Sequence, residues 1–169
     1  MDPFSELLAL CEAHKMKGSK RRKNVADPTA EKKEYVCKAG NKCVYLKEAI
    51  PSETFRSGPI FDAVKRHLPN TEAVTYDRNL RAFPHRDGRN SGPSHIWFGG
   101  DFEGGELVTE LGDVYSERNK WMGPMDLRSV THWNNPVTRG TKHSLVAFTN
   151  PTIRFATPEA RGEPEQCSC

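Results

Sequence analysis

The chain has 169 residues, of which 28% are charged, and a formal net charge of +3. This length predicts one domain with a sizeable core, and the mean hydropathy of −0.72 predicts polar segments beside that core. The small net charge argues against polyanion binding by bulk charge, and no apolar run approaches the length of a transmembrane helix. Because the first residues also lack the apolar core of a signal peptide, we expect a cytoplasmic or nuclear protein with no membrane contact.

The N-terminal residues predict a helix. Asp2 suits a capping position, Pro3 suits the first helical position, and apolar residues recur with i, i+3, i+4, i+7 spacing from Phe4 to Cys11. We expect this helix to pack against the domain; the alternative is a peptide that binds a partner through its apolar face.

A basic run follows over residues 15–23, with six cations and no anion. Such runs are usually solvated and flexible, and the functional alternative is a nuclear-localisation signal or an arm that contacts nucleic-acid phosphates. Residues 24–34 are polar and contain an Asp-Pro pair, which is typical of a linker. We therefore expect residues 1–34 to form an N-terminal helix and basic linker before a domain at 35–155, with a flexible tail at 156–169.

The hydrophobic pattern changes after residue 34. Two short strands are predicted around the turn Gly40-Asn41, and an amphipathic helix begins after Ser57-Gly58 and ends before Pro69. Short strands separated by Gly, Asn and Pro then predict a mainly β domain with flanking helices (α+β), built as a sandwich or barrel such as a jelly roll. The candidate strands are 35–37, 43–46, 73–77, 80–87, 94–98, 105–110, 113–116, 121–127 and 143–149.

His85 and Asp87 form a His-x-Asp pair within one candidate strand. If the segment is extended, both side chains point to the same face, because strand side chains alternate. An imidazole and a carboxylate on one face are two of the three ligands in the 2-His-1-carboxylate site of non-haem Fe(II). The pattern occurs by chance about once in a chain of this composition, so the remaining sequence has to complete the site.

His132 is the candidate for the third ligand. A lone histidine is more often an ordinary core or surface residue, but His132 supplies the second imidazole that the site lacks. The other histidines fit less well because they lie in predicted helices, close to the loop after Asp87 or just before the last strand: His14, His67, His95 and His143.

Lys142 and Ser144 share one face of the last candidate strand. A cation that faces a core is costly unless an anion pairs with it, and a carboxylate ligand would satisfy both groups. The alternative is that Lys142 lies at the rim and extends to solvent. Upstream, residues 102–107 contain a Gly-Gly pair before Glu-Leu, which taken alone predicts a hairpin turn.

These motifs together resemble the 2-oxoglutarate/Fe(II)-dependent dioxygenase superfamily over roughly residues 75–150. Within it, the chain is most similar to the ten-eleven-translocation and base-J thymine-hydroxylase branch and its protist and retroelement relatives, whose first motif is His-x-Asp-x-x-Asn. Most members of that branch have Arg in place of Lys142, and Lys at this spacing is similar to the prolyl 4-hydroxylases. The matching residues are His85, Asp87, Asn90, Gly104-Gly105-Glu106-Leu107, His132, Lys142 and Ser144.

The resemblance implies a double-stranded β-helix that hydroxylates a substrate C–H bond with release of succinate and CO₂. It implies an Fe(II) ion held by three residues, and 2-oxoglutarate that chelates this ion through its C1 carboxylate and keto oxygen. It places Asn90 near the C1 end and two residues on the C5 carboxylate. The iron ligands would be His85, Asp87 and His132, and the C5 partners Lys142 and Ser144.

Three functions stay open at this point. The first is a hydroxylase of a nucleobase or nucleic acid, supported by the His-x-Asp-x-x-Asn pattern and by the basic run at 15–23. The second is a protein or amino-acid hydroxylase of prolyl type, supported by the spacing of His132 and Lys142. The third is a catalytically silent metal-binding β-helix domain. We expect a monomer in each case.

Overall fold

A computed structural model of the chain describes residues 2–149, and the predicted tail at 156–169 lies outside this part. Neither of the described helices is long and apolar enough to cross a membrane. The elements are α1 (Pro3–Ala13), β1 (Lys32–Val36), β2 (Lys42–Leu46), β3 (Ser52–Phe55), α2 (Pro59–His67), β4 (Ala73–Arg78), β5 (Ser94–Gly99), β6 (Phe102–Gly104), β7 (Leu107–Thr109), β8 (Val114–Tyr115), β9 (Trp121–Met125), β10 (His132–Asn134), β11 (Val137–Gly140) and β12 (His143–Phe148).

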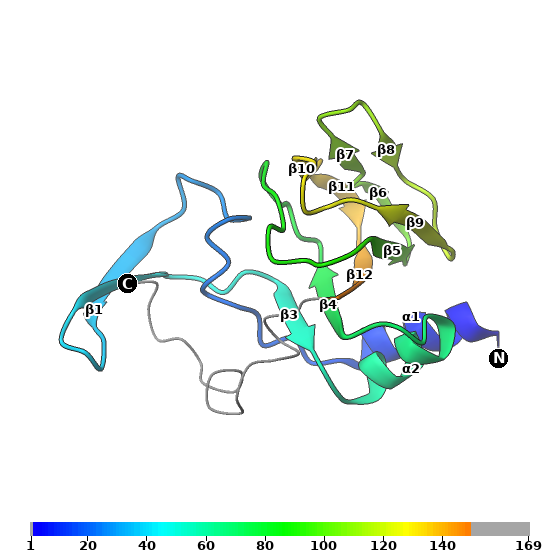
Figure 1. The fold of residues 1–169 in the computed structure, drawn as a ribbon, viewed down its shortest axis with the longest axis horizontal. Helices are drawn as coiled ribbons and strands as arrows, with labels where there is room; N and C mark the ends of the chain where they lie inside the picture. Colours follow the sequence, from blue (N-terminus) through cyan, green and yellow to red (C-terminus); the bar gives the residue numbers. More distant parts are fainter. Residues whose placement is uncertain (1, 150–169) are drawn as a thin grey trace.

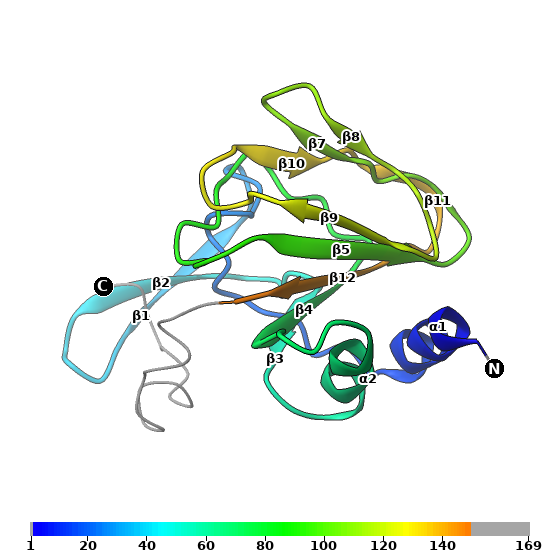
Figure 2. The ribbon, with the colours of Figure 1, turned by 45° about the vertical axis from the view of Figure 1, so that its right-hand side comes forward.

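Two antiparallel layers of strands carry the fold (Figures 1 and 2). The larger sheet has the order β3-β4-β12-β5-β9, so its central strand is the last in the sequence. The opposite layer pairs as β10-β7-β8 and β11-β6, and an isolated bridge between His85 and His132 joins the loop after β4 to β10. Along the sequence the chain therefore crosses between the two layers after β5, β8, β9 and β11, and the resulting pair of facing antiparallel sheets is that of a double-stranded β-helix. The predicted fold class is confirmed.

The larger sheet has one apolar face and one polar face, because its side chains alternate along each strand. The apolar face packs against both helices, which cover this side of the sheet in Figure 2. The other face looks between the layers and lines the main cavity. The apolar face includes Val74, Tyr76, Trp97, Leu145 and Ala147, and the cavity face includes Thr75, Asp77, Ile96, Phe98, Ser144 and Val146.

Both predicted helices are present, with their predicted starts. Asp2 caps α1, since its Oδ1 accepts hydrogen bonds from the backbone N–H groups of Phe4 and Ser5 at 3.0 and 3.1 Å. The buried residues Leu7 and Cys11 point from α1 into the core that the helices share with the sheet. The helix therefore packs on the domain rather than presenting its apolar face to solvent.

Residues 19–25 lie against the β3 edge of the larger sheet. Ser19 and Ile50 exchange two backbone hydrogen bonds of 2.8 and 2.6 Å, and Arg22 Nη1 donates to Ser52 Oγ at 2.5 Å. Val25 is fully buried in a cluster of its own. The sequence predicted a solvated run and a linker here, because cations dominate its composition and its apolar anchor is isolated. In the structure these contacts join the segment to the domain.

The segment 80–87 is not a strand, so that prediction was wrong. Asn79 has a left-handed φ of 54°, which turns the chain at the end of β4. Within residues 80–87, His85 alone forms a backbone bridge, to His132. Lys142 also lies just outside β12, where its backbone N–H donates to Asn79 Oδ1 at 2.6 Å. Four short strands were not predicted, because they carry too few apolar residues to stand out: β3, β6, β10 and β11.

Candidate active site

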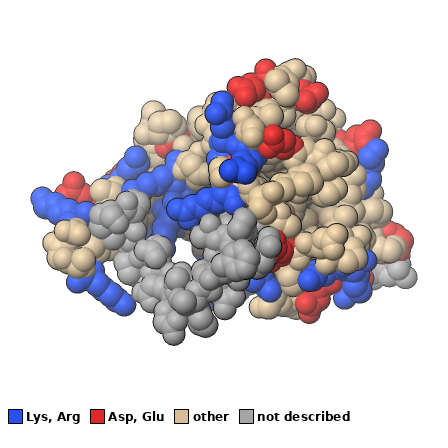
Figure 3. Space-filling view, viewed as in Figure 1, with Lys and Arg blue, Asp and Glu red and all other residues tan. Residues whose placement is uncertain are grey.

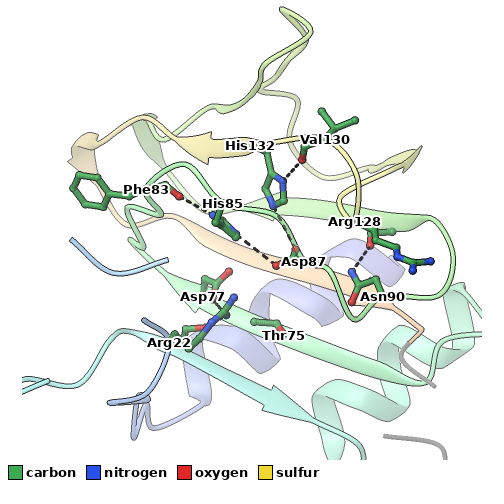
Figure 4. A network of polar contacts seen from close by, with 12 residues as sticks. Arg22, Thr75, Asp77, Phe83, His85, Asp87, Asn90, Arg128, Val130 and His132 are labelled. Atoms are coloured by element: carbon green, nitrogen blue, oxygen red, sulfur yellow. Dashed lines mark hydrogen bonds and ion pairs between the residues drawn. The ribbon is translucent and has the colours of Figure 1, made fainter. Parts of the chain in front are cut away.

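His85, Asp87 and His132 meet between the two layers (Figure 4). Asp87 Oδ1 lies 3.6 Å from His85 Nε2, and Asp87 Oδ2 lies 3.4 Å from His132 Nε2. One ligand atom from each residue lies within 4.8 Å of the other two. Ligands at right angles, each about 2.1 Å from a metal ion, are about 3 Å apart. The three side chains therefore form a facial metal site that needs little adjustment.

Backbone hydrogen bonds fix the main-chain positions of the three ligand residues. His85 and His132 exchange two N–H···O=C bonds of 3.0 Å, which holds the imidazole centroids 4.3 Å apart. The backbone N–H of Asp87 donates to the carbonyl of Leu127 at 2.8 Å. The His-x-Asp pair thus depends on contacts with β10 and the residues before it, rather than on a regular strand.

The second nitrogen of each imidazole is already used. His85 Nδ1 lies 2.7 Å from the carbonyl oxygen of Phe83, and His132 Nδ1 lies 2.9 Å from that of Val130. A carbonyl only accepts hydrogen bonds, so both Nδ1 atoms carry a proton, and both Nε2 atoms face the carboxylate. This is the arrangement by which proteins orient histidine ligands for a metal.

The charges of the site agree with metal binding. Burial lowers the pKa of His85, and the neighbouring His132 lowers it further. Burial raises the pKa of Asp87, but the hydrogen bond and charge of His132 and the charge of His85 outweigh it, so the net shift is downward. Near neutral pH the site therefore holds a carboxylate beside a neutral His85 imidazole, which is the form that binds a cation.

The site opens into a cavity of about 940 Å³ between the layers. Asn90 and Ser144, both predicted to contact the cosubstrate, line this cavity. Asn90 is 6% exposed, and its Nδ2 donates to Ser94 Oγ at 3.3 Å. Ser144 projects from β12 directly opposite Asp77 of β4. A small dicarboxylate fits a cavity of this volume together with part of a substrate.

Lys142 is 2% exposed, which excludes the alternative in which it extends to solvent. Its Nζ donates to the carbonyl of Gly105 and lies 4.1 Å from the centroid of the Phe98 ring. Phe98 lines the cavity, whereas Lys142 does not. Burial lowers the pKa of Lys142 to about 8, although the charges of Asp77 and Glu106 oppose the shift. The structure thus brings Ser144, but not the Lys142 ammonium, to the cavity surface.

Sequence reasoning missed a second polar group in the cavity, formed by Arg22 and Asp77. Asp77 is 8% exposed, and burial raises the pKa of its carboxyl group, while the charge of Arg22 lowers it. Arg22 Nη1 lies 3.7 Å from Asp77 Oδ1, an atom with no hydrogen-bond partner among the described residues. The polar residues of β3 and β4 were the available sequence clue, since alternation predicts that they share a face.

No protein-family model matches the chain, and no curated protein matches it significantly. Solved structures do match. They include NgTET1 in complex with 5mC DNA, with 18% identity, 47% of this chain, 34% of that chain and a TM-score of 0.43. They include the viral collagen prolyl hydroxylase vCPH of Paramecium Bursaria Chlorella virus-1 in its 2OG complex. This match has 16% identity, covers 58% of this chain and 78% of that chain, and has a TM-score of 0.42. A third is a Burkholderia pseudomallei oxidoreductase of the 2OG-Fe(II) oxygenase family. This match has 16% identity, covers 71% of this chain and 73% of that chain, and has a TM-score of 0.44.

The chain spans about a third of the length of NgTET1 and about three-quarters of the other two proteins. The site itself fits Fe(II) by its donor set, because two imidazoles and one carboxylate on one face leave coordination positions open.

Proposed function

We propose that the protein is an Fe(II)- and 2-oxoglutarate-dependent dioxygenase that hydroxylates a C–H bond of a nucleobase, within a nucleic acid or free. The observation that carries the enzyme class is the His85, Asp87 and His132 site, with both Nδ1 atoms bonded to carbonyls and the ligand atoms facing a cavity. When bound, Fe(II) and 2-oxoglutarate supply the oxidising chemistry and release succinate and CO₂.

The protein's own residues bind and orient. His85, Asp87 and His132 would hold the ion by Nε2, a carboxylate oxygen and Nε2. Asn90 lines the cavity and would stand near the keto-acid end of the cosubstrate. Ser144 offers a hydroxyl donor to the distal carboxylate, and Lys142 offers its ammonium from behind Phe98. Apolar side chains such as Ile96 and Leu107 complete the wall and keep water from the reacting carbon.

Support for a nucleobase comes from the charge of the cavity. The basic run, for which a phosphate-contacting arm was the functional alternative, supplies Arg21 and Arg22 to the cavity wall. A base has to leave the stack of a duplex, or come from a single strand, to reach a buried metal site. A protein or amino-acid hydroxylase of prolyl type is the second candidate, favoured by the ten-residue spacing of His132 and Lys142. A silent metal-binding domain is the third.

The test is release of succinate from 2-oxoglutarate in the presence of Fe(II), measured across single-stranded oligonucleotides, duplexes, proline-rich peptides and acidic peptides. We expect oligonucleotides to stimulate succinate release by the wild-type protein. The His132→Ala protein should release no succinate, because its iron site is incomplete. Stimulation by a peptide alone would support the prolyl-type alternative. If protein shown to hold Fe(II) forms no succinate, the remaining candidate is the catalytically silent metal-binding domain. The predictions of a monomer and of a cytoplasmic or nuclear location stay open.

A further inference from the structure

We propose that the mouth of the cavity binds phosphates of a single-stranded nucleic acid through Arg21 and Arg89, on either flank of the reacting base. This proposal deepens the proposed function and rests on it. The two guanidinium groups come from separate parts of the chain, the N-terminal basic run and the loop that carries the His-x-Asp pair. Both residues line the cavity.

Within residues 2–149, every cation that lines the cavity is an arginine, although arginine and lysine are about equally frequent in the chain. The planar guanidinium donates two parallel hydrogen bonds to a phosphate, which lysine does not. The carboxylates among the lining residues are Asp77, which faces Arg22, and Asp87, the metal ligand. Figure 3 shows Lys and Arg side chains gathered around the middle of one face of the molecule. The lining arginines are Arg21, Arg22, Arg56, Arg86 and Arg89.

Three of these arginines, Arg22, Arg56 and Arg86, already have partners inside the protein. Arg22 contacts Ser52 and Asp77, as described above. Arg86 donates from Nε to Thr131 Oγ1 at 3.0 Å and lies 3.8 Å from Glu110. By contrast, no side-chain hydrogen bond or ion pair joins Arg21 or Arg89 to any residue in 2–149. Their donors are therefore available to a ligand.

The available arginines are also held in place by their neighbours. Arg21 lies between the backbone bridge at Ser19 and the anchored side chain of Arg22, so its backbone has no freedom to swing away. Arg89 lies between Asp87 and the buried Asn90, whose backbone N–H donates to the Asp87 carbonyl at 3.0 Å. Contacts that are fixed before binding cost less ordering entropy than a flexible arm would.

The partner follows from this geometry. A strand that spans the mouth can place one base towards His85 and His132 while the phosphates on each side meet the two guanidinium groups. In a duplex the same base stays stacked away from the metal site until it is flipped. An acidic peptide also complements the charge, but its carboxylates have no fixed spacing on either side of a flat ring, so a single strand is the better fit.

The experiment measures binding of a fluorescent single-stranded oligonucleotide to the full chain by anisotropy, over a range of salt concentrations. Arg21→Gln and Arg89→Gln should each reduce the slope of log K against log salt by about 0.7, and the double variant by about 1.4. Each loss corresponds to about fivefold weaker binding at 0.1 M salt. Arg66→Gln is the matched control, since it removes one exposed cation from α2, on the opposite face of the sheet, where it pairs with Glu6.

Basal succinate formation without oligonucleotide is measured on the same proteins. Unchanged basal formation with a reduced slope supports the proposal. Slopes that match wild type, an equal loss in Arg66→Gln, tighter binding of the duplex, or preference for a poly-glutamate peptide would each overturn it. If wild type binds no oligonucleotide but forms succinate, the phosphate site is wrong and the oxygenase chemistry stands. If it forms no succinate but the slopes change as expected, the surface stands and the catalytic proposal fails.

Discussion

Raising the pH should weaken 2-oxoglutarate binding through Lys142 alone. Burial lowers the pKa of this ammonium to about 8, so the group is charged at neutral pH and becomes neutral as pH rises through that value. In the proposed role, Lys142 holds the distal carboxylate of the cosubstrate through its charged form. At pH 9 only about one lysine in ten is charged, so the dissociation constant should be about tenfold higher than at pH 7. His85 and Asp87, whose pKa values are both lowered, have already lost their protons over this range and contribute little to the change.

The assay is isothermal titration of 2-oxoglutarate into protein loaded with Mn(II), without oxygen, from pH 6.5 to 9.5. Lys142→Arg should remove the pH dependence, because a guanidinium stays charged throughout. Pyruvate is the matched ligand, since it has the same keto-acid end but no distal carboxylate. Its binding should depend neither on the protonation of Lys142 nor on its replacement by arginine. An equal rise for both ligands, or the same pH profile in Lys142→Arg, would refute the assignment of Lys142 to the distal carboxylate.

Three further substitutions probe the site. His132→Ala should weaken Fe(II) binding by more than about 100-fold in equilibrium dialysis while leaving the thermal unfolding of the metal-free protein nearly unchanged; unchanged affinity would remove it as a ligand. Asp77→Asn should leave the free energy of unfolding at pH 7, measured by urea denaturation, equal to that of wild type or higher. The reason is that a carboxyl group whose pKa is raised on folding destabilises the fold once it is ionised, and this penalty disappears as pH falls below the unfolded pKa. A loss of stability above about 1 kcal/mol contradicts this. Gly105→Ala should cost about 1–2 kcal/mol and weaken 2-oxoglutarate binding, because its Cβ would lie 2.8 Å from Lys142 Cδ at a φ of +72°; Gly112→Ala, at a φ of +90° with open space around it, is the control for backbone strain alone.

The sequence predicted the parts of the site that depend on residue type and short-range spacing. His85 and Asp87 are two residues apart, and their meeting with His132 follows from a fold that the strand pattern already indicated. The structure nevertheless brings them together differently from the prediction. The segment is irregular, and the backbone bridge between His85 and His132 replaces strand geometry.

The Arg22 and Asp77 pair lies beyond what spacing predicts. These residues are 55 positions apart in the sequence, and their contact depends on Ser19 bridging to Ile50 and on Val25 entering a small core. Each of these contacts contributes little by itself, so none produces a recognisable hydrophobic period. Lys142 is a different case: the sequence left open whether it faces the core or extends to solvent from the rim, and the structure buries its side chain behind Phe98.

The basic run therefore combines two roles that its composition does not separate. Arg22 faces a buried carboxylate and ties the run to β3, so removing it leaves Asp77 without its cation and disturbs the wall of the cavity. Arg21 is its immediate neighbour, yet its side chain has no partner among residues 2–149 and is available at the mouth. Deleting residues 15–23 would remove both at once, and any loss of nucleic-acid binding would then report a damaged cavity as readily as a lost phosphate contact. Single substitutions of Arg21, with Arg22 intact, separate the two effects.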